Sequence, residues 1–203
     1  MIQIKEILLD NEATLEGVDH IPQIGWKLIS DQRNTIQKTY QYQISDQADF
    51  STLVYDSGVV ESKQSHHHSP SDFDIKPYAQ YFVRVKVTAN DGSSSDWSSS
   101  AHFFTGKMDT EWTADFISID EEKDAQNSKT VYLRKDFQLA KPIATAYLHS
   151  SALGLYIPYL NGKRVGDSEL APGFTSYHKH ICYQSYDVTD QVQEGLNCLG
   201  AQL

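Results

Sequence analysis

Polar and apolar side chains alternate along much of the chain with a period of two residues. In the segment 81–88, one set of alternate positions holds a tyrosine and three valines, and the other set holds Phe82, Arg84, Lys86 and Thr88. In the segment 38–45, two tyrosines and an isoleucine alternate with glutamine and serine. Because successive side chains of a β-strand point to opposite faces, both segments are predicted to be half-buried strands.

Turn signals separate the alternating segments at regular intervals. Asn161 and Gly162 form the strongest hairpin signal, since glycine supplies the positive φ angle that a two-residue turn needs. Further turns are predicted at 56–58 and 90–92. Amphipathic helical patterns are scarce, and the segment 187–195 is expected to form one short helical turn at most. The sequence therefore predicts an all-β protein of the sandwich type.

The alternation is interrupted between residues 105 and 128, which indicates two domains. We expect the first domain to cover 1–106 and the second to cover 107–203, with 107–110 as the hinge. Residues 120–129 are polar, charged and aperiodic, so they are predicted to form a loop. A chain of 203 residues is long enough to give each domain a core of its own.

Composition and charge describe a folded chain with an acidic surface. Aromatic residues make up 11% of the chain and the net charge is -10. No basic stripe that would bind nucleic acid is present, and no apolar run reaches the roughly 18 residues of a membrane span. The first residues lack the basic and apolar regions of a secretory signal. We therefore expect a cytoplasmic protein, without nucleic-acid or membrane partners, in which Cys182 and Cys198 are reduced.

Histidines are the first candidates for a metal site. Three occur in a row at 66–68, but neighbouring side chains of a strand point to opposite faces, and no nearby cysteine completes a zinc set. His178 and His180 would share a face of a strand. Candidates for a third ligand are Asp167, Glu169 and His149. The interpretation as solvated or hydrogen-bonded histidines is favoured in both places, so neither a metal site nor a cofactor is predicted.

Motifs for catalysis are weaker still. Glycoside hydrolysis needs two carboxyl groups on either side of a sugar, about 5–10 Å apart. The sequence offers Asp167 with Glu169, and Asp187 with Asp190, but each residue has a simpler explanation beside a turn or in a surface connection. Serine and cysteine nucleophile motifs and glycine-rich phosphate loops are absent from the sequence. No catalytic residue is predicted.

The first block carries landmarks in a recognisable order. Ile75, Pro77 and Tyr81 lead into an alternating strand, which is followed by the turn at 90–92 and by Trp97. This arrangement resembles the second half of a fibronectin type III domain. The resemblance implies that Tyr81 is a tyrosine-corner residue, whose ring lies in the core and whose hydroxyl bonds to the backbone a few residues upstream. Trp97 is expected to anchor the serine-rich turn.

The second block carries a longer set of motifs. They are WTADFI at 112–117, LRKDF at 133–137, ALGLY at 152–156, LNGKRVG at 160–166, LAPGFTSY at 170–177, YQSYDVT at 183–189 and GLN at 195–197. Together they resemble the N-terminal region of bacterial α-L-rhamnosidases. Phe174 stands where that family commonly has tryptophan. Its flat apolar ring could stack on a sugar or fill a core, and the core interpretation is favoured.

The resemblance implies that residues 107–203 form a jelly-roll-like β-sandwich that is truncated at its C-terminal end. Full-length relatives continue into an (α/α)6 barrel that holds the acidic catalytic residues, and those motifs have no counterpart here. The chain would then be a non-catalytic fragment, inactive alone, of a glycoside hydrolase that removes terminal α-L-rhamnose from glycosides with inversion of configuration. The implied partners are the barrel in cis and rhamnoside carbohydrate. The alternative is a free-standing carbohydrate-binding or adhesion module.

Individual residues follow from this interpretation. The side chains expected to contact sugar are Phe174, Tyr177, His178 and Arg164. The residues expected to form turns are Asn161, Gly162, Pro172 and Gly173. A truncated sandwich would expose an unpaired sheet edge, so self-association through such an edge is also expected.

Overall fold

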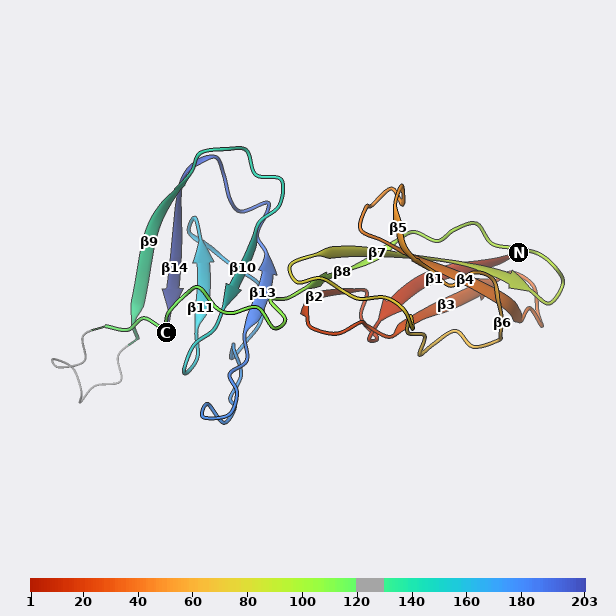
Figure 1. Cartoon of the computed structure of the whole chain (residues 1–203), viewed down its shortest axis with the longest axis horizontal. Coiled ribbons are helices and arrows are strands. Elements are labelled where there is room, and N and C mark those ends of the chain that lie inside the picture. The colour runs from red at the N-terminus through yellow and green to blue at the C-terminus, as the bar shows by residue number, and fades with distance from the viewer. Residues whose placement is uncertain (120–129) are drawn as a thin grey trace. The chain divides into compact units, whose positions relative to one another are not determined.

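The computed structural model describes residues 1–119 and 130–203, and its strands confirm the all-β prediction (Figure 1). The chain divides into two compact units, Met1–Glu111 and Trp112–Leu203. The loop predicted at 120–129 lies outside the described residues. Within the described ranges, no helix is long and apolar enough to cross a membrane.

The first unit contains eight strands in two sheets. They are β1 (Ile2–Leu9), β2 (Thr14–Val18), β3 (Ile24–Ser30), β4 (Gln37–Ser45), β5 (Leu53–Asp56), β6 (Val60–Glu61), β7 (Gln80–Ala89) and β8 (Ala101–Thr105). The larger sheet has the order β2-β8-β7-β4-β5, with β6 also paired to β4. The pair β2 and β8 is parallel, and the other pairs of this sheet are antiparallel. The smaller sheet, β1 with β3, packs through β1 against β7 and β8, which makes a β-sandwich (Figure 1).

The core of the first unit follows the predicted alternation. On β7, Tyr81, Val83, Val85 and Val87 are all buried, while the residues between them are only partly covered. The hydroxyl of Tyr81 accepts a hydrogen bond from the backbone nitrogen of Lys76 at 3.0 Å. This bond fastens the entry into β7 to the core.

The outer face of β4 and β7 carries a stacked cation. The guanidinium of Arg84 lies 4.3 Å from the ring centroid of Phe50 and 4.6 Å from that of Trp97. It also donates to Gln43 Oε1 at 2.6 and 2.8 Å. Because the arginine covers it, Gln43 is buried although it faces away from the core. A cation–π contact such as those of Arg84 with Phe50 and Trp97 contributes about 0.5–1 kcal/mol at exposed sites.

A buried histidine packs against the core face of β4. The ring of His68 stacks on Trp26 at 4.6 Å with 12° between the planes, and it lies 4.5 Å from the ring of Tyr40. Only 8% of His68 is exposed, and burial lowers its pKa from the ordinary value of 6.5. His68 is therefore part of the core in its neutral form.

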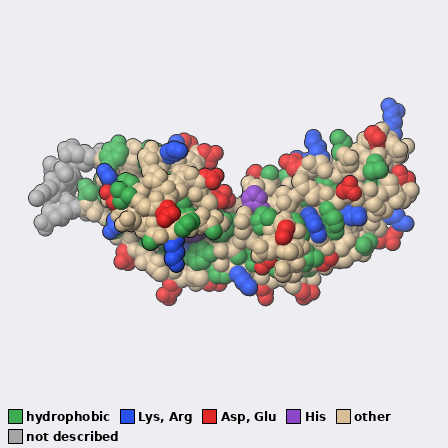
Figure 2. Space-filling model, turned by 90° about the horizontal axis from the view of Figure 1, so that it is seen from above, with side chains coloured by type: hydrophobic (Ala, Val, Ile, Leu, Met, Phe, Trp, Pro, Cys, Tyr) green, Lys and Arg blue, Asp and Glu red, His purple; other side chains and the backbone are tan. Residues whose placement is uncertain are grey.

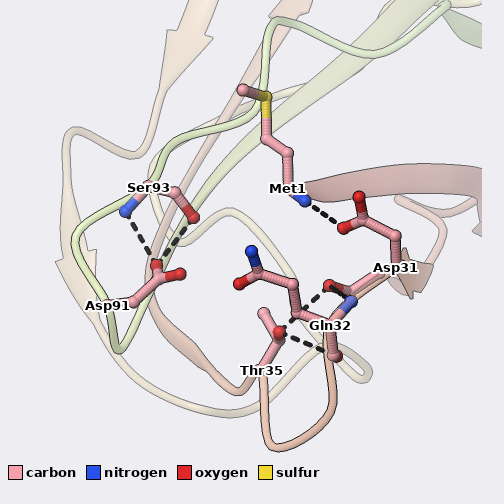
Figure 3. Close-up of polar contacts among 7 residues, drawn as sticks. Met1, Asp31, Gln32, Thr35, Asp91 and Ser93 are labelled. Atoms are coloured by element: carbon pink, nitrogen blue, oxygen red, sulfur yellow. Dashed lines mark hydrogen bonds and ion pairs between the residues drawn. The ribbon is translucent and has the colours of Figure 1, made fainter.

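The turns at one end of the first unit are closed by their own polar side chains (Figure 3). Thr35 Oγ1 donates to the carbonyl of Gln32 at 3.0 Å. Asp91 Oδ1 accepts from the backbone nitrogen of Ser93 at 2.9 Å and from its hydroxyl at 2.7 Å. The amino group of Met1 pairs with Asp31. These bonds satisfy backbone groups that the sheets leave open.

The link after β8 is bound to the first unit. The backbone nitrogen of Gly106 donates to the carbonyl of Val18 at 2.8 Å, and the carbonyl of Gly106 accepts from Tyr78 at 3.1 Å. The hydroxyls of Thr110 and Tyr78 are 3.0 Å apart. A hinge at 107–110 stays a prediction.

In its described residues, 112–119 and 130–203, the second unit has six strands in two sheets. They are β9 (Tyr132–Leu139), β10 (Tyr147–Ser150), β11 (Ile157–Leu160), β12 (Lys163–Arg164), β13 (Gln184–Asp187) and β14 (Gly195–Gln202). Four strands form the antiparallel sheet β12-β11-β14-β9, and β10 pairs only with β13 among the described residues. Leu160, Val165, Tyr186 and Val188 form a small buried cluster between the two sheets. The jelly-roll form of this sandwich stays a prediction.

Two asparagines hold the second unit together at one end. Asn161 and Gly162 have φ angles of 51° and 80°, which suit the two-residue turn between β11 and β12. The amide of Asn161 also donates to Asn197 Oδ1 at 2.9 Å and to the carbonyl of Gln191 at 2.8 Å, and its Oδ1 accepts from the backbone nitrogen of Cys198 at 2.8 Å. Asn197, which is 1% exposed, bonds in turn to both backbone groups of Gln193. The two amides thereby fix the connection between β13 and β14.

This connection begins with the predicted helical turn. There the backbone nitrogen of Val192 donates to the carbonyl of Val188 at 3.1 Å.

The burial of His68 predicts how the stability of the first unit depends on pH. An unfolded chain protonates histidine near its ordinary pKa of 6.5, whereas the folded chain resists protonation. Stability should therefore fall as the pH drops below about 6.5 and level off below the folded-state pKa. Urea unfolding followed by fluorescence at several pH values between 7.5 and 5 measures this fall. In His68→Phe, which keeps an aromatic ring, the loss of unfolding free energy between pH 7.5 and 5 should be smaller. In the exposed control His66→Phe this loss should persist. A loss in His68→Phe equal to that of the parent chain would contradict the assignment of His68 as a buried neutral histidine.

The asparagine network predicts a large effect of one amide. Asn197→Ala removes bonds to Asn161, Gln193 and Gly195 and leaves buried polar groups without partners. Since each such group costs about 1–3 kcal/mol, we expect the free energy of unfolding of the second unit to fall by roughly 3 kcal/mol. The matched control is Gln138→Ala on the exposed face of β9. This variant should change the free energy of unfolding by less than about 0.5 kcal/mol. Equal effects of the two variants in urea unfolding would refute the network's role.

Candidate functional site

The long connection from β12 to β13, residues 165–183, carries most of the residues expected to contact sugar. It extends past the end of β13 in Figure 1. The chain enters this loop through Gly166, whose φ is +68°. A Cβ atom at this position would lie 2.3 Å from the buried ring of Tyr186. Only glycine therefore lets the loop leave β12 so close to the core.

A buried tyrosine holds the middle of the loop against the strands. The hydroxyl of Tyr156 donates to Gln184 Oε1 at 2.9 Å and lies 2.6 Å from the hydroxyl of Ser150. Gln184 Nε2 donates to the carbonyl of Pro172 at 3.1 Å, and the backbone nitrogen of Tyr156 donates to the carbonyl of Ala171 at 3.0 Å. Burial raises the pKa of the Tyr156 hydroxyl far above its ordinary range, so it remains a neutral donor.

Further bonds fix the far end and the tip of the loop. The hydroxyl of Ser151 donates to the carbonyl of Cys182 at 2.7 Å. At the tip, the carbonyl of Ser176 accepts from the backbone nitrogens of Lys179 and His180 at 2.7 and 3.1 Å. The hydroxyl of Thr175 donates to the carbonyl of His180 at 2.8 Å. The loop therefore presents its side chains from a backbone that is held on several sides.

The tip of the loop forms most of the wall of a shallow hollow of about 740 Å³. Its lining consists of Leu153, Phe174, Thr175, Ser176, Tyr177, His178 and Ile181. The rings of Phe174 and Tyr177 are 5.8 Å apart at 60°, and 92% of Phe174 is exposed. The expectation that Phe174 fills a core is therefore wrong, because the turn at Pro172 and Gly173 carries its ring to the surface. Gly173 has a φ of 97° and its backbone nitrogen donates to the carbonyl of Leu170 at 3.0 Å.

The structure brings together three of the four residues expected to contact sugar. Phe174, Tyr177 and His178 all line the hollow, whereas Arg164 does not. Arg164 instead donates to the carbonyl of Ser168 at 3.0 Å and to Glu169 at 2.9 Å. Tyr156 and Gln184, which hold the loop, were not singled out from the sequence. They lie in the recognised motifs, but their bonds across strands follow from the fold and leave no local pattern.

The other candidate groups have different surroundings. Asp187 Oδ1 accepts from the backbone nitrogen of Thr189 at 2.9 Å, and Glu169 pairs with Arg164 as described. Cys182 and Cys198 are both free. Within residues 1–119 and 130–203, no group of three or more His, Cys, Asp and Glu side chains could hold a metal ion. On the face shown in Figure 2, the Lys and Arg side chains of the described residues are scattered and form no continuous basic band.

Family models match both units. Residues 4–109 match the model described as the Rha78A-like, N-terminal immunoglobulin domain. Residues 141–203 match the α-L-rhamnosidase N-terminal domain. The first match agrees with an immunoglobulin-like sandwich, while the fibronectin type III assignment stays a prediction.

Individual relatives match almost the whole chain. An α-L-rhamnosidase of Alteromonas sp. is 31% identical over 192 residues, which is 89% of this chain and 21% of the relative. An α-L-rhamnosidase of Formosa agariphila is 28% identical over 196 residues, 91% of this chain and again 21% of the relative. The solved α-L-rhamnosidase from Dictyoglumus thermophilum superimposes with a TM-score of 0.86 at 29% identity, over 98% of this chain and 25% of that one.

The chain thus spans about a fifth of the length of the curated relatives it matches. The first family model covers more than half of the chain, the second covers most of the second unit, and the motifs at 152–156, 160–166, 170–177 and 183–189 lie within the second match. The chain belongs to the α-L-rhamnosidase family and corresponds to its N-terminal region.

Proposed function

We propose that this chain is a non-catalytic part of an α-L-rhamnosidase, a glycoside hydrolase that removes terminal α-L-rhamnose. In this proposal it supports the catalytic part in cis and contacts carbohydrate through the hollow beside Phe174. The observation that carries the carbohydrate contact is an aromatic ring that is 92% exposed on a loop held by several hydrogen bonds.

The lining of the hollow favours binding over catalysis. Hydrolysis of a glycoside requires an acidic and a basic carboxyl group on either side of the scissile bond. None of the residues that line the hollow carries a carboxyl group. Glu169, on the same loop, is paired with Arg164 and is largely exposed.

The chemistry of the hollow suits a deoxy sugar. The methyl group and ring C–H bonds of rhamnose form an apolar face, which can pack on the flat rings of Phe174 and Tyr177. Its hydroxyl groups need hydrogen-bonding partners, and Ser176 and His178 supply them beside the rings. Apolar walls with a few polar groups are typical of small-molecule sites.

Calorimetric titration of the chain with methyl α-L-rhamnoside tests the carbohydrate contact. We expect millimolar binding, and a loss of affinity of at least roughly tenfold in Phe174→Ala and in Tyr177→Ala, because each removes one ring of the platform. The control is Tyr132→Ala, an aromatic residue that is 73% exposed outside the hollow, and it should bind like the parent chain. Absence of binding, or equal affinity in Phe174→Ala, would refute the contact and leave the supporting role as it stands.

A further inference from the structure

The four-stranded sheet of the second unit ends in two edge strands of very different length. β12 has two residues, whereas β9 has eight and is paired, among the described residues, with β14 alone (Figure 1). An edge strand presents a row of backbone N–H and C=O groups with which a further strand can pair. The long edge of β9 is therefore the place where this sheet can be extended.

The hydrogen bonds to β14 show which backbone groups of β9 point to the open edge. Directly before β9, Val131 and Leu203 exchange two backbone hydrogen bonds, of 2.9 and 2.8 Å. The register then continues without a shift as far as Leu139 and Gly195. Because the N–H and C=O groups alternate in direction along a strand, those of the odd-numbered residues point to β14. Those of the even-numbered residues, 132 to 138, point to the open edge.

Two side chains of opposite charge lie in the middle of this edge. The guanidinium of Arg134 donates to the carboxylate of Asp136 at 3.0 Å, and both side chains are exposed. Phe137, the next residue, packs against the buried cluster of the sandwich. Since successive side chains point to opposite faces, Arg134 and Asp136 share the outer face of the sheet. The edge therefore carries one positive and one negative charge, two residues apart on the same face.

We propose that the open edge of β9 is a self-association surface, on which β9 of a second copy of this chain pairs antiparallel about a two-fold axis at Lys135. In this arrangement Arg134 of each copy lies opposite Asp136 of the other. The even-numbered residues of the two strands meet in hydrogen-bonded pairs, which gives about eight backbone hydrogen bonds. The four charges alternate in sign, so each arginine has one carboxylate on its own strand and one on the facing strand.

The charges favour this register over the neighbouring ones. An axis at Arg134 would place the two arginines opposite each other, and an axis at Asp136 would do the same with the two carboxylates. Like charges directly opposite each other destabilise a sheet. An axis at Lys135 brings only the two lysines together, and these side chains are exposed. We therefore expect a weak, reversible dimer.

This inference is independent of the proposed function, because no residue of β9 lines the hollow beside Phe174. The competing occupant of the edge is a strand of another polypeptide. In that case the chain alone would remain a monomer.

Sedimentation velocity at increasing concentrations of the 203-residue chain tests the association, and we expect a monomer–dimer equilibrium. Arg134→Asp places a carboxylate opposite Asp136 of the second copy, so the dissociation constant of the dimer should rise at least roughly tenfold. Combining Arg134→Asp with Asp136→Arg should restore the parent value. The matched control is Lys163→Glu on β12, which changes the net charge by the same amount and should leave the dissociation constant unchanged.

A disulfide tests the register directly. The residue on the two-fold axis faces its own copy in a non-hydrogen-bonded pair, whose Cα atoms are about 4.5 Å apart, and a disulfide can bridge that distance. Lys135→Cys should therefore form a covalent dimer when oxidised glutathione is added. Lys163→Cys should give no more covalent dimer than the parent chain, whose Cys182 and Cys198 set the background.

Circular dichroism verifies that each variant is folded. Three results would overturn the proposal. The first is a monomer at every concentration of the parent chain. The second is a folded Arg134→Asp variant that dimerises like the parent chain. The third is a Lys135→Cys variant that gives no covalent dimer above the background.

Discussion

The hydroxyl of Tyr156 is the contact on which the candidate site depends. It joins Ser150 at the end of β10 to Gln184 at the start of β13, and Gln184 then holds the carbonyl of Pro172. The residues from Phe174 to His178 follow directly after that anchor. An exposed aromatic ring can serve as a platform only if its backbone does not move away, because ordering a loop on binding costs free energy. The buried hydrogen bonds meet that requirement before a ligand arrives.

The two units solve the packing problem in different ways. The first unit closes a large core, in which the valines of β7 and the rings of Trp26, Tyr40 and His68 are buried together. The second unit has a small buried cluster and relies on polar networks, above all the pair Asn161 and Asn197. A thin sandwich held by hydrogen bonds leaves apolar surface available. The hollow beside Phe174 lies in this second unit.

Local patterns in the sequence predicted the parts of the fold that depend on local physics. The alternation at 81–88 gave the buried face of β7, and Asn161 with Gly162 gave the hairpin. Local patterns could not predict contacts between residues that are far apart in the sequence. Nothing near Asn161 indicates Asn197, and nothing near Phe174 indicates that its loop leaves the core. Arg164 was expected to contact sugar, but its guanidinium donates to the carboxylate of Glu169, five residues later in the chain.

The central claim is that this chain contributes support and contacts to an α-L-rhamnosidase without performing the reaction. The most direct test is release of 4-nitrophenol from 4-nitrophenyl α-L-rhamnoside by the purified 203-residue chain. The account predicts a rate equal to that of buffer, because hydrolysis needs a pair of carboxyl groups that the hollow lacks. Turnover that co-purifies with the chain and is lost on replacing Asp167, Glu169, Asp187 or Asp190 would contradict it.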